Sequence, residues 1–263
     1  MTGRRNVPVR ASGAAAAGTV ASPAFPALRG VSAGQEKLLP ELPAGFRKTT
    51  GHRETGLLRD SLYTLEQNGV YHVISEDYSY KSEPYYTILT AEMNGKNVRP
   101  ASSAVLEAYV VPMCLERAGL AGIPVAEWGI SQGYVPLPSI IYGLNYFATS
   151  ADYFLVRDNA KAKEVIAHVT NKGKYPFCYQ KLPPDATVHT CVSIFGRTTD
   201  SCAAIAGLAE KIYQLFSIPL VTMVFVKSQN HYQLSSLSSA KYSRISGEER
   251  ALLTAYLSRQ EFL

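Results

Sequence analysis

The chain has 263 residues and a mass of 28.7 kDa, which is enough for one large domain or two small ones with a substantial hydrophobic core. Hydrophobic residues make up 46% of the chain and charged residues 18%, and these proportions exclude collagen-like and wholly disordered proteins. The net charge is +5, but most of the excess lies in residues 1–35, which carry four arginines and no acid. Because the remaining charges nearly balance and form no basic cluster, we expect no nucleic-acid-binding surface.

The N-terminal segment differs in composition from the rest of the chain. Residues 11–35 consist mostly of Ala, Gly, Ser and Pro, with too few large apolar side chains to repay the entropy of ordering. We therefore expect residues 1–35 to form a disordered basic leader and residues 36–263 to form a single domain. An organelle transit peptide is the alternative interpretation of the leader.

Neither the apolar pattern nor the cysteines indicate secretion or a membrane. No run of residues reaches the roughly 18-residue apolar length of a spanning helix, and the leader lacks the apolar segment of a secretory signal. The four cysteines show no C-x-x-C pairing and no histidine at the usual metal-ligand offsets. We expect a cytoplasmic protein with reduced thiols, no metal site and no cofactor.

The first predicted elements follow one another closely. A β-favouring stretch ends near Ser75, and a helix is expected from 83 to about 94. Ser82 is its expected N-cap, and Gly95 is expected to end it in a left-handed conformation.

The central third of the chain shows weaker patterns. Ser102 or Ser103 is predicted to cap a second helix, and Pro112 should kink or shorten it. Residues 119–149 contain scattered prolines and glycines, so we expect no regular element there. Residues 160–169 are typical of a helix.

The C-terminal third is the most regular part of the chain. Thr199 or Asp200 is predicted to cap a helix with one apolar face, and Ser246 with Glu249 predicts a capping box for a last helix at 247–260. The strands expected around these helices are 188–195, 220–227 and 232–239, the last two forming an antiparallel hairpin. The alternation predicts an α/β fold with a mixed sheet, in which β-α and antiparallel hairpin elements are flanked by helices.

Common catalytic motifs are missing from the sequence. There is no nucleophile elbow, no H-E-x-x-H and no phosphate-binding glycine loop. His189 and Cys191 are two residues apart in a predicted strand and share a face, but no sequence feature activates the thiol. A hydrolase using Cys191 or Ser193 stays a remote alternative, and we predict no catalytic residue.

Two strand-to-helix junctions carry the candidate ligand-binding residues. Backbone N–H groups at such a junction suit an anion, and tyrosine hydroxyls can orient a polar ligand. Arg197, at the second junction, has a guanidinium suited to a carboxylate or phosphate. Tyrosine packing, and a salt bridge from Arg197 to Asp200 or Asp77, are the structural alternatives. The candidate ligand-binding residues are Tyr78, Tyr80, Ser82, Tyr86 and Arg197.

The same junctions carry a resemblance to a known family. The first reads SEDYSYKSEPYYTILTAEMNGKNVRPAS, and the second begins SIFGRTTD and continues through IYQLFSIPLVTMVFV and HYQLSSLSSAKYSRISGEERALLTAYL. Both segments resemble the RimK-like ATP-grasp N-terminal domain. The resemblance covers roughly residues 57–118 and 187–258, and the section 119–186 between them is expected to be variable or inserted.

The resemblance implies a domain that works beside an ATP-grasp ligase, an enzyme that joins a carboxylate to an amine through an acyl phosphate. The expected role is a non-catalytic substrate-binding or architectural domain, with an amino acid or peptide as ligand and a separately encoded ATP-grasp ligase as partner. We do not expect the ATP-grasp module itself in this chain, because it would need a further domain of ~150–200 residues. The alternative is an N-terminal part or subunit of an ATP-dependent carboxylate–amine ligase, in which case the enzyme class would be ligase.

Overall fold

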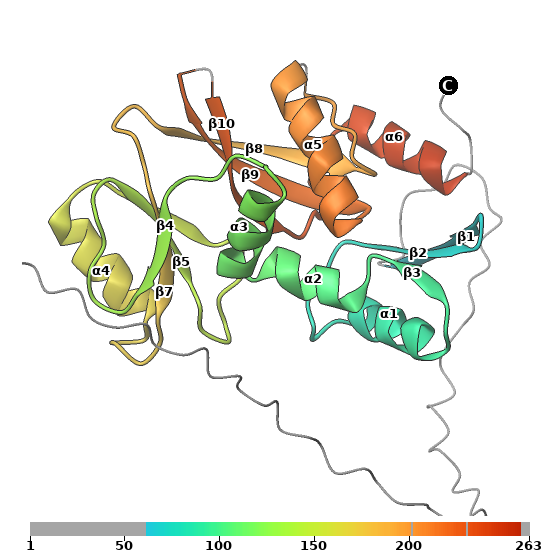
Figure 1. Cartoon of the computed structure of the whole chain (residues 1–263), viewed down its shortest axis with the longest axis horizontal. Helices are drawn as coiled ribbons and strands as arrows, with labels where there is room; N and C mark the ends of the chain where they lie inside the picture. The colour runs from blue at the N-terminus through green and yellow to red at the C-terminus, as the bar shows by residue number, and fades with distance from the viewer. Residues whose placement is uncertain (1–61, 201, 230, 259–263) are drawn as a thin grey trace, which may run out of the picture. The chain divides into compact units, whose positions relative to one another are not determined.

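The computed structural model describes residues 62–200, 202–229 and 231–258 (Figure 1). All described residues lie in one compact unit, Glu54–Leu263. The predicted leader, 1–35, and the boundary at residue 36 lie outside the described residues. Within the described part, the α/β fold is confirmed: ten strands form three sheets, and six helices pack against them.

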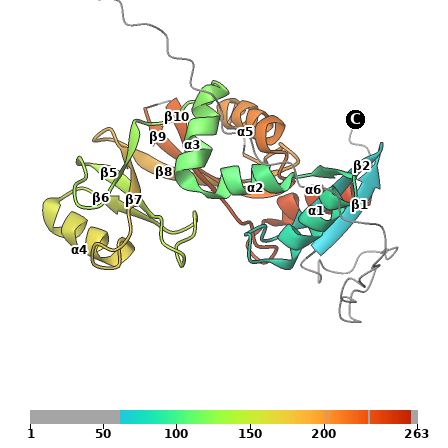
Figure 2. The ribbon, with the colours of Figure 1, turned by 60° about the horizontal axis from the view of Figure 1, so that its bottom comes forward.

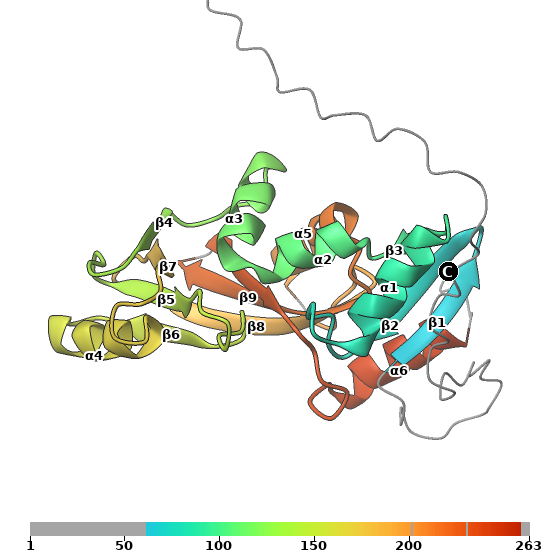
Figure 3. The ribbon, with the colours of Figure 1, turned by 90° about the horizontal axis from the view of Figure 1, so that it is seen from below.

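The first sheet contains strands β1 (Leu62–Gln67), β2 (Val70–Ser75) and β3 (Asn97–Arg99). Strands β1 and β2 are antiparallel, whereas β2 and β3 are parallel and joined through helix α1 (Glu83–Met93), which lies along the sheet (Figure 3). The predicted end of α1 is confirmed, because Gly95 has a φ of +73°. Its N–H donates to Glu92, and the Lys96 N–H donates to Ala91, as in a Schellman C-cap.

The second predicted helix is two helices, α2 (Ser102–Tyr109) and α3 (Val111–Leu120). Pro112 lies in the first turn of α3, where the missing N–H costs nothing. The expected serine cap is wrong, since Ala101 is the N-cap of α2. Instead, the Glu92 carboxylate of α1 accepts the Ser102 N–H at 2.9 Å and the Ser102 hydroxyl at 2.6 Å. A carboxylate ten residues away therefore replaces the local cap.

The second sheet has the order β4-β7-β5-β6, with every neighbouring pair antiparallel. The helix predicted at 160–169 is confirmed as α4 (Asn159–Val169), which packs against this sheet (Figure 2). The Asp158 side chain accepts the Lys161 N–H as its cap. The expectation that 119–149 lacks regular structure is wrong, because β4 and β5 lie there. The strands are β4 (Trp128–Ser131), β5 (Ser139–Gly143), β6 (Tyr153–Val156) and β7 (Phe177–Lys181).

The third sheet has the order β10-β9-β8 and is antiparallel throughout. The predicted strands and hairpin are confirmed as β8 (Thr187–Ile194), β9 (Leu220–Ser228) and β10 (His231–Ser238). Helix α5 (Ala203–Phe216) follows β8, with Cys202 as its N-cap in place of the expected Thr199 or Asp200. The capping box of Ser246 and Glu249 is confirmed at α6 (Gly247–Leu257).

The third sheet supports most of the core. One of its faces, with Met223 and Phe225 of β9, packs against α2, α3 and α5 in a first hydrophobic cluster. Val226 lies in a second cluster with β5 and β7, and Leu220 lies in a third cluster with α6 and the first sheet. A fourth cluster lies between α4 and the second sheet. Two buried hydrogen bonds also join the second sheet to β10: one links the Tyr142 and Ser235 hydroxyls, and in the other the Gln180 amide donates to the Ser235 carbonyl.

The structure bears on the cysteines and on membrane-spanning helices. The four cysteines are free thiols, with Cys114 and Cys178 buried and Cys191 and Cys202 partly exposed. Among the described residues, no helix combines the length and the apolar character needed to cross a bilayer.

Candidate functional site

A tight turn after β8 presents Arg197 to solvent. Phe195 and Gly196 both have positive φ, at 50° and 79°, and Ile194 and Arg197 exchange backbone hydrogen bonds of 2.8 and 2.9 Å. Positive φ at both central residues is the geometry of a type I′ turn. The Phe195 ring stacks on Tyr256 of α6 with ring centroids 4.4 Å apart, which holds the turn to the third cluster. Arg197 follows as an exposed residue.

The first junction is only partly open to solvent. Tyr78 has no exposed surface, and its hydroxyl accepts the Ser75 N–H at 2.9 Å and donates to the Val73 carbonyl at 3.2 Å. Its ring lies in the first hydrophobic cluster. The packing alternative therefore describes Tyr78, which does not line an open surface and is corrected from a ligand-binding to a core residue.

The other three residues of this junction lie nearer the surface. The Ser82 hydroxyl donates to the carbonyls of Ser79 at 2.7 Å and Asp77 at 3.2 Å, so its hydrogen bonds stabilise the loop before α1. Although Ser82 is the N-cap of α1, its side chain makes no cap hydrogen bond. Tyr86 is 58% exposed and Tyr80 is 46% exposed, so both can meet a ligand.

Tyr80 belongs to an exposed group that we call the aromatic surface, formed by Tyr80, Lys81, Tyr146 and Phe147. The Lys81 ammonium lies 3.2 Å from the centroid of the Tyr146 ring and donates to the Tyr146 carbonyl at 2.8 Å. The Tyr80 and Phe147 rings contact the same Tyr146 ring edge-on, at centroid distances of 6.5 and 5.4 Å. Cation–π and ring contacts thus bring together two segments that are far apart in sequence.

The acids expected to pair with Arg197 have other partners. Asp77 accepts the Ser79 N–H at 2.8 Å and the Ser239 hydroxyl at 3.2 Å. Asp200 lies 2.7 Å from His189, between Oδ2 and Nε2. Whether Arg197 and the tyrosines meet one ligand stays a prediction.

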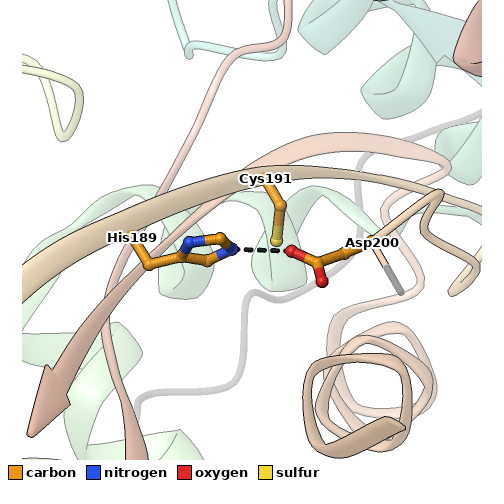
Figure 4. Close-up of side chains that lie close together, drawn as sticks. All are labelled: His189, Cys191 and Asp200. Carbon is orange, nitrogen blue, oxygen red and sulfur yellow. Dashed lines mark hydrogen bonds and ion pairs between the residues drawn. The ribbon is translucent and has the colours of Figure 1, made fainter. Parts of the chain in front are cut away.

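His189, Cys191 and Asp200 form a second group, which we call the metal-capable group (Figure 4). His189 and Cys191 project from the same face of β8, which is an edge strand, and Asp200 lies between the type I′ turn and α5. One potential metal-ligand atom of each residue lies within 4.8 Å of the others. The Asp200 carboxylate is held by the Cys202 N–H, which donates to Oδ1 at 2.9 Å.

The electrostatics of this group do not favour a thiol nucleophile. Burial first, and the neighbouring Asp200 carboxylate second, raise the pKa of Cys191 to about 12. A protonated thiol is a poor nucleophile, and His189 is directed at Asp200. Ser193 is buried, with 1% of its surface exposed. The remote hydrolase alternative therefore gains no support from the geometry.

The pKa of Cys202 is shifted in the opposite direction to that of Cys191. The backbone amides of Ile205 and then Ala204, at the start of α5, lower its pKa. The N-terminus of a helix stabilises an anion, which is the physical reason for this shift. Asp200 also has a lowered pKa, first because of the Cys202 N–H and then because of His189.

Part of each group was not predicted from the sequence. The aromatic surface needs Tyr146 and Phe147, which lie in the central section where no element was expected. The metal-capable group needs Asp200, which the sequence assigned to capping or to Arg197. The sequence did indicate that His189 and Cys191 share a face of one strand. Nothing in it predicted that Asp200, nine residues after Cys191, lies beside them.

A family model matches part of the second half of the chain. Residues 158–256 match the model of the RimK-like ATP-grasp N-terminal domain family, so the resemblance is confirmed for this region. The match begins inside the section 119–186 that we expected to be variable or inserted. Comparison with curated protein sequences gives no match.

Solved structures of two D-alanine–D-alanine ligases share the fold. The D-alanine–D-alanine ligases of Helicobacter pylori and Coxiella burnetii are each 10% identical to the chain, with a TM-score of 0.50. The match to the Helicobacter pylori ligase covers 66% of this chain and 65% of the ligase, and the match to the Coxiella burnetii ligase covers 69% of this chain and 63% of the ligase. The chain thus spans just under two thirds of each ligase. A RimK domain ATP-grasp protein of Sphaerobacter thermophilus is 15% identical, with a TM-score of 0.49, coverage of 67% of this chain and 74% of its own length. At these identities the likeness concerns the fold alone.

Proposed function

Because residues 158–256 match the RimK-like ATP-grasp N-terminal domain, we propose that this chain is a non-catalytic domain that serves an ATP-grasp carboxylate–amine ligase. Its task is to present an amino acid or peptide substrate to a separately encoded ligase. The four free thiols fit a reducing compartment, so we place this function in the cytoplasm.

The aromatic surface is the observation that carries the substrate-binding role. Exposed tyrosine and phenylalanine rings offer faces for apolar side chains, and the Lys81 ammonium supplies a positive charge for a carboxylate. Lys81 is held against Tyr146 before any ligand arrives, which lowers the entropy cost of binding. Arg197 and Tyr86 are the other exposed candidates for the same ligand.

The metal-capable group bears on one part of the proposal, namely that this chain does not itself hold the magnesium–nucleotide cofactor of a ligase. It combines an imidazole, a thiol and a single carboxylate. Magnesium bound to nucleotide phosphates prefers oxygen ligands, so this donor set is a poor match for that cofactor.

A thermal-shift experiment on the full chain tests the proposal with a panel of amino acids, dipeptides and ATP with Mg²⁺. A ligand present at about 100 times its Kd stabilises the folded state by about 2.7 kcal/mol. For a domain of this size, that corresponds to a rise in Tm of roughly 5–11 °C. We expect such a rise with an amino acid or peptide.

Three variants localise the ligand. Tyr80→Ala and Arg197→Ala should both abolish the shift if one ligand spans them, whereas Tyr134→Ala should keep it. Tyr134 is the matched control because it is 73% exposed and lies outside the aromatic surface. Loss in only one of the two test variants would separate Arg197 from the tyrosines and refute a shared site.

ATP with Mg²⁺ distinguishes the alternative function. The ATP-grasp fold of the structural neighbours favours a part or subunit of an ATP-dependent carboxylate–amine ligase as the second candidate. A Tm shift with ATP and Mg²⁺ but with no amino acid or peptide would support that candidate. No shift with any member of the panel would contradict substrate binding.

A further inference from the structure

We propose that His189, Cys191 and Asp200 bind one divalent transition-metal ion of the zinc class at the start of α5. Their ligand atoms already lie within 4.8 Å of one another. Around tetrahedral zinc, nitrogen, sulfur and oxygen ligands at about 2.0–2.3 Å from the metal lie roughly 3.3–3.8 Å apart. The pair of His189 Nε2 and Asp200 Oδ2 is now 2.7 Å apart, so these two atoms must separate by roughly 0.6 Å when the ion binds.

The fold holds the three donors in place before an ion arrives. His189 and Cys191 are fixed on one face of β8 by their i,i+2 spacing. The Tyr232 ring packs edge-on against the His189 ring, with centroids 5.9 Å apart. The Cys202 N–H holds Oδ1 of Asp200, so that Oδ2 points to the group. Such outer contacts orient metal ligands in known sites.

The donor set selects the class of metal. A thiol with an imidazole suits zinc, cobalt and nickel, whereas magnesium and calcium take oxygen ligands. Cys191 is a protonated thiol in the metal-free protein, and it releases this proton to solvent when it binds the ion. The resulting thiolate and the Asp200 carboxylate together neutralise a divalent ion. This neutrality matters because Lys227 and the positive end of the α5 dipole both face Asp200 and oppose a bare cation.

The position at a sheet edge leaves room for a further ligand. The side chains of His189 and Asp200 are 35% and 19% exposed, so solvent reaches the group. Zinc sites with three protein ligands keep an open coordination position for water or a bound molecule. We therefore assign a three-ligand site whose fourth position is filled from solvent.

Cobalt substitution tests the site in the full chain. Co²⁺ bound through Cys191 should give a thiolate-to-cobalt charge-transfer band together with the intense visible bands of a four-coordinate ion. Zn²⁺ added afterwards should displace Co²⁺ and remove both features. Competition with a chromophoric chelator then measures the Kd for Zn²⁺.

Four variants assign the ligands. Cys191→Ser should lose the charge-transfer band. His189→Gln and Asp200→Asn should each weaken Zn²⁺ binding at least about tenfold, because loss of a residue that only supports a metal ligand already costs about that much affinity. Cys202→Ser is the matched control, because it removes a neighbouring thiol while serine is a favoured N-cap. Its band should be unchanged.

The outcomes separate the proposal from a simple His–Asp hydrogen bond. Circular dichroism and Tm, measured without metal, establish that each variant folds. If Cys191→Ser does not fold, Asp200→Asn serves as the test variant, because its amide oxygen can still accept the Cys202 N–H. A charge-transfer band retained in Cys191→Ser, or a band lost in Cys202→Ser alone, would overturn the assignment. Equal Zn²⁺ affinity in the wild type and in Asp200→Asn would do so as well.

Discussion

Removal of the Tyr78 hydroxyl should destabilise the fold, although the residue lies in a segment that could be taken for a ligand site. In Tyr78→Phe the ring stays in the first hydrophobic cluster, but the hydrogen bonds to the Ser75 N–H and the Val73 carbonyl are lost. Burial is the main reason why the pKa of Tyr78 lies well above its ordinary value, so the hydroxyl stays protonated and donates at every usable pH.

The size of the effect follows from the two hydrogen bonds. Each intramolecular hydrogen bond contributes about 0.5–1.5 kcal/mol net, and leaving a buried polar group unsatisfied costs more. We therefore expect Tyr78→Phe to lower the free energy of unfolding by roughly 1–3 kcal/mol. At a central value of about 2 kcal/mol, Tm should fall by roughly 4–8 °C.

Urea unfolding measures this difference, because the chain has a single tryptophan, Trp128, whose fluorescence reports on the second sheet. Far-ultraviolet circular dichroism provides the second probe, and coincident transitions justify a two-state fit. Tyr80→Phe is the matched control, since Tyr80 is 46% exposed and its change should stay within about 0.5 kcal/mol.

Equal urea midpoints for Tyr78→Phe and Tyr80→Phe would refute a structural role of the Tyr78 hydroxyl. The same conclusion would follow if Tyr78→Phe kept the wild-type stability and changed only the thermal shift with an amino acid or peptide. That second result would restore Tyr78 as a ligand-binding residue.

Three further predictions concern stability. Burial first, and the neighbouring Arg99 second, lower the pKa of His72. The stability that neutral His72 contributes is therefore fully present above pH ~6.5, the ordinary pKa, and is lost as the pH falls through the lowered pKa of the folded state. His72→Phe should therefore flatten the urea midpoint between about pH 7 and pH 5, and an unchanged pH profile would contradict this. Glu92→Ala should cost about 1–2 kcal/mol by removing the acceptor of the Ser102 N–H, whereas Glu92→Gln should cost less; equal losses would show that the contact is not a cap. Gly196→Ala should cost roughly 1–2 kcal/mol or more, because φ is +79° and the added Cβ would lie 2.9 Å from an aromatic side chain of α5. Gly207→Ala, in an exposed helix interior with no atom near the added Cβ, should instead stabilise by about 0.5–1 kcal/mol, and two changes of the same sign would refute the comparison.

The sequence predicted elements whose signals are local. The capping box at Ser246 and Glu249, the glycine after α1 and the β9–β10 hairpin all depend on residues a few positions apart, and all were found. Pro112 correctly indicated an interruption, because the missing N–H acts within one turn.

Long-range contacts explain what the sequence did not predict. Strand β5 is short and lies among prolines, and it is a strand because β6 and β7 pair with it on both sides. The cap of α2 comes from Glu92 on another helix, and the aromatic surface depends on Lys81 reaching Tyr146. The group of His189 with Asp200 depends on a turn that folds the chain back beside β8, and no local pattern reports that return.

The placement of β9 among three hydrophobic clusters has a consequence for slow motions of the protein. Its adjacent residues Phe225 and Val226 belong to different clusters, and Leu220 belongs to a third. Local opening of α5, of α6 or of the second sheet would each expose one side of this strand and leave the other packed. The amide protons in the middle of β9 should therefore exchange with deuterated solvent only when all three clusters separate together, and their exchange rate would report the free energy of global unfolding.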